Sequence, residues 1–216
     1  IHGILVDINT FNASTTLNIN NNNFKNMGFS TAGTGVIDMI RLGAATFTLD
    51  ATFNIKNNTF TNLSLINSGN TSLINDQQSL SSTVEGNTIV GTFTRTGVSG
   101  TFWCYLNNGS QTGGLHTVKN NNFSNITLAG TTAFQGIRNS GGSTAVQTIL
   151  VTGNTVSNVI GGSGDTSGIH NGFEAAGSLV SNNIVKDITG TGNVYGIILG
   201  KNNGSPSPGS VDCNNN

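Results

Sequence analysis

The amino-acid sequence predicts an all-β fold, a parallel β-solenoid of about six coils with three short strands in each coil. Two observations carry this prediction: one eleven-residue motif occurs six times along the 216 residues, and apolar residues alternate with polar residues inside it. A third observation is that two further short apolar patterns lie between consecutive copies. A repeat of this length is one supersecondary unit, which buries its apolar face by stacking on its neighbours.

Each copy of the motif has an apolar residue, two spacers, an asparagine, one spacer and a second apolar residue, usually followed by another asparagine and an apolar residue. Successive copies lie 29 to 36 residues apart, so the insertions belong in loops. The period of two within the motif is that of a strand with one buried face. We expect one buried column of apolar side chains, made of Phe24, Phe60, Ile89, Phe123, Val156 and Val185.

The first asparagine of each motif lies between two apolar runs, where the chain must turn sharply. Asparagine is the residue other than glycine that best tolerates a left-handed backbone conformation. Stacked in successive coils, these side-chain amides are expected to form a ladder in which each donates to the next coil. The predicted ladder is Asn22, Asn58, Asn87, Asn121, Asn154 and Asn183.

The second strand of each coil is predicted about a dozen residues after the motif, where a small residue precedes apolar ones. The third strand is predicted just before the next motif, for example at 45–49 and 145–150. Asn, Thr, Ser and Gly dominate the remaining residues and disfavour helices. The copies of the second signal are 35–37, 72–74, 100–103, 136–138, 168–170 and 196–198.

The runs 53–63 and 118–126 carry a resemblance to a known family, the right-handed parallel β-helix proteins built from pectate-lyase-type repeats. The resemblance covers nearly the whole chain and implies the right-handed β-helix fold. The family includes polysaccharide lyases and hydrolases, phage tailspikes, and long bacterial adhesins or stalks, so function must be argued from sites. The chain looks most similar to repeat regions of large secreted bacterial surface proteins, including those of gliding or type 9 secreting bacteria.

The amino-acid composition restricts the binding partners and the cellular location that we expect for the protein. Charged residues make up 8% of the chain, and 8 Lys and Arg nearly balance 9 Asp and Glu. This balance disfavours nucleic acid as a partner. The longest apolar run is much shorter than the roughly 18 residues needed to cross a membrane, so no membrane insertion is expected. The low-charge, Thr-, Ser-, Asn- and Gly-rich composition indicates an extracellular or cell-surface location.

We expect residues 1–216 to form one β-helix domain, or a segment of a longer solenoid, without visible caps. The chain begins in the middle of a repeat, and 211–216 begins a seventh motif. The ends of a solenoid without caps expose strand edges whose backbone groups have no hydrogen-bond partners. We therefore expect further coils, or like subunits, at both ends, and an end-to-end stacking filament subunit is one alternative function.

The titratable residues favour a structural or adhesive role over catalysis. A lyase or hydrolase of this fold needs clustered carboxylates, and the acids of this sequence do not stack. Asp7 and Asp38 are the one nearly aligned pair, and turn or solvated positions also account for them. The histidines His2 and His116 fall in different columns, so neither a metal site nor a cofactor is predicted. A polysaccharide lyase or hydrolase of this fold remains the competing function.

One constellation indicates glycan binding. Trp103, Arg138 and His170 follow the small residue of the second strand at nearly the same position on neighbouring coils. An aromatic platform beside Arg and His would hold a sugar ring or an acidic glycan by stacking and hydrogen bonding. The alternative is that Trp103 fills the core while Arg138 and His170 face water. The function predicted from the sequence is a structural or adhesive segment that binds glycans or surfaces weakly.

Overall fold

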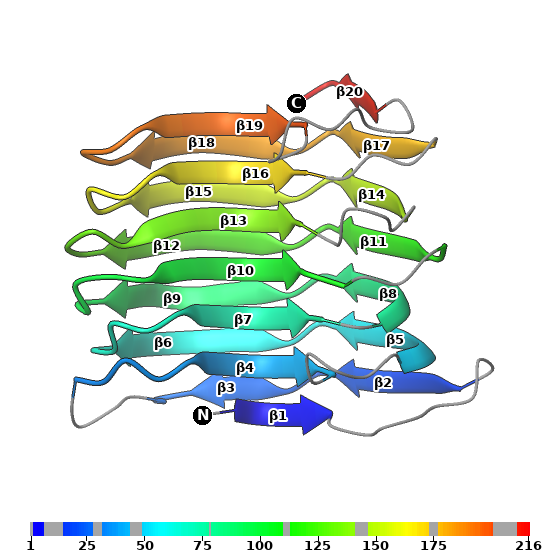
Figure 1. The fold of residues 1–216 in the computed structure, drawn as a ribbon, viewed down its shortest axis with the longest axis horizontal. Helices are drawn as coiled ribbons and strands as arrows, with labels where there is room; N and C mark the ends of the chain where they lie inside the picture. Colours follow the sequence, from blue (N-terminus) through cyan, green and yellow to red (C-terminus); the bar gives the residue numbers. More distant parts are fainter. Residues whose placement is uncertain are drawn as a thin grey trace.

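The computed structural model shows an all-β parallel solenoid, which confirms the predicted fold class (Figure 1). Every strand pairing is parallel, and the described residues contain no helix. Each coil adds one strand to each of three sheets, here called sheets A, B and C. The described residues are 2–6, 15–27, 32–43, 49–77, 79–109, 113–140, 147–172, 177–200 and 211–216.

The order of the strands within each sheet follows their order along the chain, so each strand lies between those of the coils before and after it (Figure 1). Sheet A contains β1 (His2–Val6), β4 (Ile37–Leu42), β7 (Thr71–Asp76), β10 (Thr101–Asn107), β13 (Ala133–Asn139), β16 (Thr166–Asn171) and β19 (Val194–Leu199). Sheet B contains β2 (Thr16–Asn20), β5 (Leu49–Lys56), β8 (Ser79–Glu85), β11 (Leu115–Lys119), β14 (Thr148–Thr152), β17 (Ser178–Ser181) and β20 (Val211–Asn214). Sheet C contains β3 (Asn23–Lys25), β6 (Thr59–Leu65), β9 (Thr88–Arg95), β12 (Asn122–Leu128), β15 (Thr155–Ile160) and β18 (Ile184–Thr189).

The core is a column of apolar side chains between the three sheets. The residues predicted for the motif column are buried, except Val185, which is partly buried against the same core. The rings of Phe24 and Phe60 stack with their centroids 5.2 Å apart, and Phe93 of sheet C stacks on Phe102 of sheet A at 4.1 Å. Stacking along the column and across the sheets thus joins successive coils through apolar contact.

The asparagine ladder is present between sheets B and C and includes one asparagine more than predicted, Asn216. In its middle, Asn121 Oδ1 accepts hydrogen bonds from the backbone N and from Nδ2 of Asn87, both at 2.9 Å. Asn121 Nδ2 donates to Val84 O and to Asn154 Oδ1, also both at 2.9 Å. The amide-to-amide bond recurs between neighbouring members of the set Asn22, Asn58, Asn87, Asn121, Asn154, Asn183 and Asn216.

The sharp turn lies one residue before the ladder asparagine, so the predicted position of the left-handed residue was wrong by one. The residues that turn the chain have φ between 53° and 66°. The ladder residue itself holds its amide inside the solenoid, while its neighbour carries the strained conformation, which Asn and Gly tolerate best. The turning residues are Asn21, Asn57, Gly86, Asn120, Gly153, Asn182 and Asn215.

A second left-handed position follows in sheet C, inside every strand except β3, which ends one residue before it, and explains the second asparagine of the motif. Its φ values lie between 49° and 76°. The turn at Asn125 lets Phe123 and Ile126, three residues apart, both point into the core, where both are buried. An unbroken two-residue alternation would turn one of them outward. This position is filled by Asn26, Asn62, Gly91, Asn125, Asn158 and Asp187.

A buried arginine ties together the turns that lead from sheet C to sheet A. Arg95 is 1% exposed, and its Nε donates to Asn67 O at 3.2 Å. Its Nη2 donates to Ser99 O at 2.6 Å and to Gly69 O, and its Nη1 donates to Thr132 Oγ1 at 3.3 Å. The guanidinium thus contacts turns of three successive coils. Hydrogen bonds to acceptors of the protein replace those that it would make with water.

A second buried polar cluster lies between sheets A and B. Asp76 Oδ2 of β7 lies 3.6 Å from His116 Nδ1 of β11, and both side chains are fully buried. Ser79 Oγ donates to the Asp76 carboxylate at 2.6 Å, and Ser82 Oγ lies 2.9 Å from His116 Nδ1. Burial by itself raises the pKa of Asp76, but the hydrogen bonds and charge of His116, with the two serines, outweigh it and hold this pKa below its usual value.

Candidate functional site

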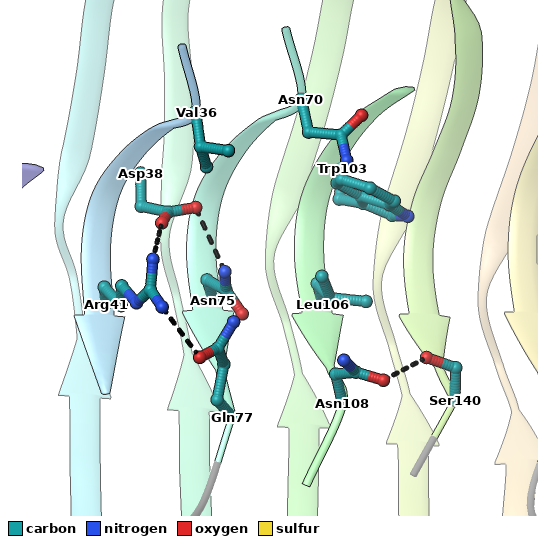
Figure 2. A pocket seen from close by; sticks show the side chains of 10 residues that line it. All are labelled: Val36, Asp38, Arg41, Asn70, Asn75, Gln77, Trp103, Leu106, Asn108 and Ser140. Atoms are coloured by element: carbon teal, nitrogen blue, oxygen red, sulfur yellow. Dashed lines mark hydrogen bonds and ion pairs between the residues drawn. The ribbon is translucent and has the colours of Figure 1, made fainter. Parts of the chain in front are cut away.

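A groove with a volume of about 330 Å³ crosses the outer face of sheet A (Figure 2). It spans four coils, because its lining side chains come from β4, β7, β10 and the residues next to these strands and to β13. One charged pair lies on one side of it, and an aromatic ring lies on the other (Figure 2). The lining residues are Val36, Asp38, Arg41, Asn70, Asn75, Gln77, Trp103, Leu106, Asn108 and Ser140.

The aromatic side of the groove is formed by Trp103 of β10. In the parallel register, Trp103 pairs with Ser72 of β7 and Gln135 of β13. Its indole Nε1 donates a hydrogen bond to Gln135 Oε1 at 2.8 Å. This bond satisfies the polar edge of the ring and fixes its orientation, while the side chain remains partly exposed. A fixed, partly exposed aromatic face offers a platform for stacking.

The charged side of the groove is already neutralised by internal contacts. Asp38 is 1% exposed, and its carboxylate accepts from Arg41 Nη1 at 3.3 Å, from Asn75 Nδ2 at 3.1 Å and from Ser72 Oγ. Arg41 Nη2 donates onward to Gln77 Oε1 at 3.0 Å (Figure 2). The members of this network come from two neighbouring coils, whose strands β4 and β7 pair in register. Their hydrogen bonds hold the amides of Asn75 and Gln77 at the groove.

A row of outward positions, three residues after Trp103 on each strand, continues from the groove toward later coils. Leu106 lines the groove and pairs in register with Arg138, which in turn pairs with His170. Arg138 is 6% exposed, and its Nη1 has no hydrogen-bond partner in the described part of the chain. Burial lowers the pKa of the Arg138 guanidinium, since leaving water disfavours its charge.

The structure brings together two of the three predicted glycan contacts in one row and places the third in another. Arg138 and His170 are direct neighbours, whereas Trp103 pairs with Gln135 and lies three residues before Leu106, the partner of Arg138. The alignment of Trp103 with the other two was therefore wrong. Gly100, used to align it, lies in the preceding turn with φ 84°, whereas Gly136 is inside strand β13.

The predicted pairing of Asp7 with Asp38 concerns one residue that lies outside the described part of the chain, Asp7. Asp38 itself pairs in register with His2, and His2 Nδ1 lies 3.5 Å from Asp38 Oδ2. The lining of the groove contains a single carboxylate, that of Asp38. A second acid beside it, of the kind that two-carboxylate hydrolysis needs, is not among these lining residues.

Sequence reasoning missed most of the groove. Gln135, which orients the indole, and Asn75, Gln77 and Arg41, which surround Asp38, carry no motif of their own. Their common signal is their place in the outward rows of sheet A, and this place becomes visible only once the register between coils is known. A polar residue on an outward row otherwise looks like any solvated surface residue.

The described residues contain no group of three or more His, Cys, Asp or Glu side chains arranged to hold a metal ion. Within the same part of the chain, no helix has the length and apolar character needed to cross a membrane.

Three parallel sheets, a buried asparagine ladder and an outer groove define the chain as a parallel β-solenoid protein. Comparison of the chain with protein-family models, with curated proteins and with solved structures yields no match. The fold class is therefore established by the geometry alone, and the function must be argued from the groove.

Proposed function

We propose that the chain is a structural and adhesive β-solenoid segment of an extracellular or cell-surface bacterial protein, and that it binds saccharides weakly in the groove of sheet A. The observation that carries the proposal is Trp103, a partly exposed indole held in place by Gln135 inside a groove. The low charge of the chain, with 8% charged residues, supports an extracellular stalk.

The chemistry of the groove suits a sugar ring. Sugars present apolar C–H faces that stack on aromatic rings and hydroxyl groups that exchange hydrogen bonds with amides. Trp103 supplies the stacking face, and Asn70, Asn75, Gln77 and Asn108 supply amides around it. Stacking and amide hydrogen bonds require no charge on the ligand, which is why this recognition extends to neutral saccharides.

The size of the groove favours weak binding. Its volume of about 330 Å³ is near the lower limit for ligand pockets, which is about 300 Å³. It therefore accommodates a short stretch of a glycan chain. Weak sites become effective when many act together, as on a long solenoid or a surface that carries many copies.

Trp103 is the single tryptophan of the chain, so its fluorescence reports on the groove directly. We expect glycan tetrasaccharides to shift or quench this fluorescence, with dissociation constants in the range of about 0.1–1 mM. Replacing Trp103 by alanine should weaken binding about tenfold when binding is followed by calorimetry, because the stacking face is lost.

A matched control is Tyr195→Ala. Tyr195 is an exposed aromatic residue of sheet A, and it continues the row of Trp103 through Gln135 and Ser167 without lining the groove. We expect this variant to bind saccharides as the unmodified chain does. The proposal fails if no saccharide of a broad panel perturbs Trp103, or if both substitutions weaken binding equally.

A further inference from the structure

The unpaired guanidinium of Arg138 points to a property of the groove beyond neutral saccharide binding. We infer that Arg138 forms an anion subsite at the edge of the groove and that the preferred ligand is a saccharide bearing a carboxylate or a sulfate. This inference rests on the proposed saccharide binding, which it extends by naming the chemical class of the ligand.

The other charged groups in and around the solenoid core are already compensated. Arg95 is 1% exposed, compared with 6% for Arg138, but it donates to backbone carbonyl groups of two turns and to a threonine hydroxyl. Arg41 pairs with Asp38, and the buried Asp76 pairs with His116. Arg138 differs, because it makes no hydrogen bond or ion pair with any described residue and its Nη1 is buried.

The Nη1 end of this guanidinium is costly to bury, because it has lost its water and has gained no hydrogen-bond partner in return. An anion that reaches it gains electrostatic energy in surroundings of low dielectric constant. The planar guanidinium matches carboxylate and sulfate groups, to which it donates two parallel hydrogen bonds. The missing partner is therefore best supplied by an oxyanion of the ligand.

The position of Arg138 brings this subsite within reach of a ligand that stacks on Trp103. Its register partner Leu106 lines the groove, and so does Ser140, two residues after Arg138 on the same segment. Neighbouring strands of a sheet lie about 4.8 Å apart, so Arg138 is one strand away from β10, which carries Trp103. Arg138 also lies three residues further along the strand direction than Gln135, the register partner of Trp103, which adds roughly 10 Å at about 3.3 Å per residue. A charged substituent further along the glycan chain, rather than on the stacked ring itself, therefore reaches the guanidinium.

The test compares three tetrasaccharides of equal length, a neutral glucan, a uronate and a sulfated glycan, by Trp103 fluorescence and calorimetry at low salt. We expect the two charged ligands to bind the unmodified chain at least about tenfold more tightly than the neutral one. Arg138→Gln should remove this advantage without changing the affinity for the neutral glucan. Arg138→Lys should retain part of it, because lysine keeps the charge and loses the paired donors.

Lys25→Gln is the matched control, because it removes one positive charge from an exposed position on sheet C. It should retain the preference for charged ligands. Equal affinity for all three tetrasaccharides, or a preference that survives Arg138→Gln, overturns the anion subsite and leaves saccharide binding intact. A preference that emerges only in Glu174→Gln also overturns it, since that acid, which lies outside the described residues, would then be the partner of Arg138.

If no tetrasaccharide perturbs Trp103, the proposed function fails, and a second measurement still decides on Arg138. In that measurement, Tm is followed in sodium sulfate and in sodium chloride at equal ionic strength. A larger sulfate effect in the unmodified chain than in Arg138→Gln supports a site for free anions. The same effect in both reflects only the general exclusion of sulfate from protein surfaces and overturns the inference.

Discussion

Replacement of Asn121 by alanine is expected to lower the free energy of unfolding by about 3–5 kcal/mol. The substitution removes the acceptor of two donors of Asn87 and the donor that satisfies Val84 O. These groups lie inside the solenoid, where an unsatisfied polar group costs about 1–3 kcal/mol each. Urea unfolding followed by circular dichroism measures the loss. Asn121→Asp should be harmful too, because its carboxylate would face Val84 O and Asn154 Oδ1, which are both acceptors.

The control for this substitution is the next residue along the chain. Asn122 is exposed, and its side chain accepts a single hydrogen bond, from Ser124 Oγ at 2.6 Å. Asn122→Ala should change the free energy of unfolding by less than about 1 kcal/mol. If the two alanine variants were equally stable, the ladder would contribute nothing beyond ordinary surface asparagines, and its role in joining the coils would be disproved.

Replacement of Asp76 by alanine is expected to cost a similar amount, about 3–5 kcal/mol, because it leaves several buried polar groups without the carboxylate that they contact. His116 would lose the carboxylate that lies 3.6 Å from its Nδ1, and Ser79 would lose the acceptor of its hydroxyl and of its backbone N–H. For a chain of this length, the loss corresponds to a fall in Tm of roughly 10 °C. Differential scanning calorimetry near neutral pH measures this fall.

The same carboxylate makes stability depend on pH in the acid range. The pKa of Asp76 in the folded chain lies below its ordinary value of 3.8, so the folded state favours the ionised form. Its contribution is therefore present above pH 4 and is lost as the pH falls through the lowered pKa. Tyr105, whose pKa burial and the Asp76 charge raise, stays neutral throughout this range.

Asp76→Asn provides the measurement of this pH dependence, because the amide cannot ionise. The difference in Tm between the unmodified chain and Asp76→Asn should be constant above pH 5 and should shrink as the pH falls below about 4. Asp165→Asn, at an exposed position that bonds Asn193, should show a much smaller difference. A difference that grows in acid would mean that the pKa of Asp76 is raised in the folded chain.

Much of the fold was predictable because a solenoid repeats its local rules. The recurrence of Phe60, Phe123 and their equivalents identified the buried column, and the recurring asparagines identified the ladder. The turn was predicted at Asn58, but the structure has it one residue earlier, at Asn57. The prediction failed because both positions are occupied by asparagine. Residue type alone does not separate an amide that turns the chain from one that points inside.

The candidate site was less predictable, because it depends on which residues of different coils lie side by side. Trp103 was recognised as a contact, but Gln135, which orients it, was not. The loops between coils differ in length, so an alignment based on small residues slipped between Gly100 and Gly136. Such a slip moves every outward residue of the strand relative to its neighbours and rearranges the surface without changing the core pattern.

The sequence by itself determined the class of fold. Its apolar pattern repeats in every coil, and stacking the coils in parallel buries all copies of that pattern in one continuous core. It also determined which residue types line the interior. Only the tertiary structure decided the register of sheet A, and with it the groove around Trp103 and the unpaired Arg138. Hydrogen bonding between strands is nearly independent of the outward side chains, so their patterns constrain the register weakly, and the packing of the whole coil selects it.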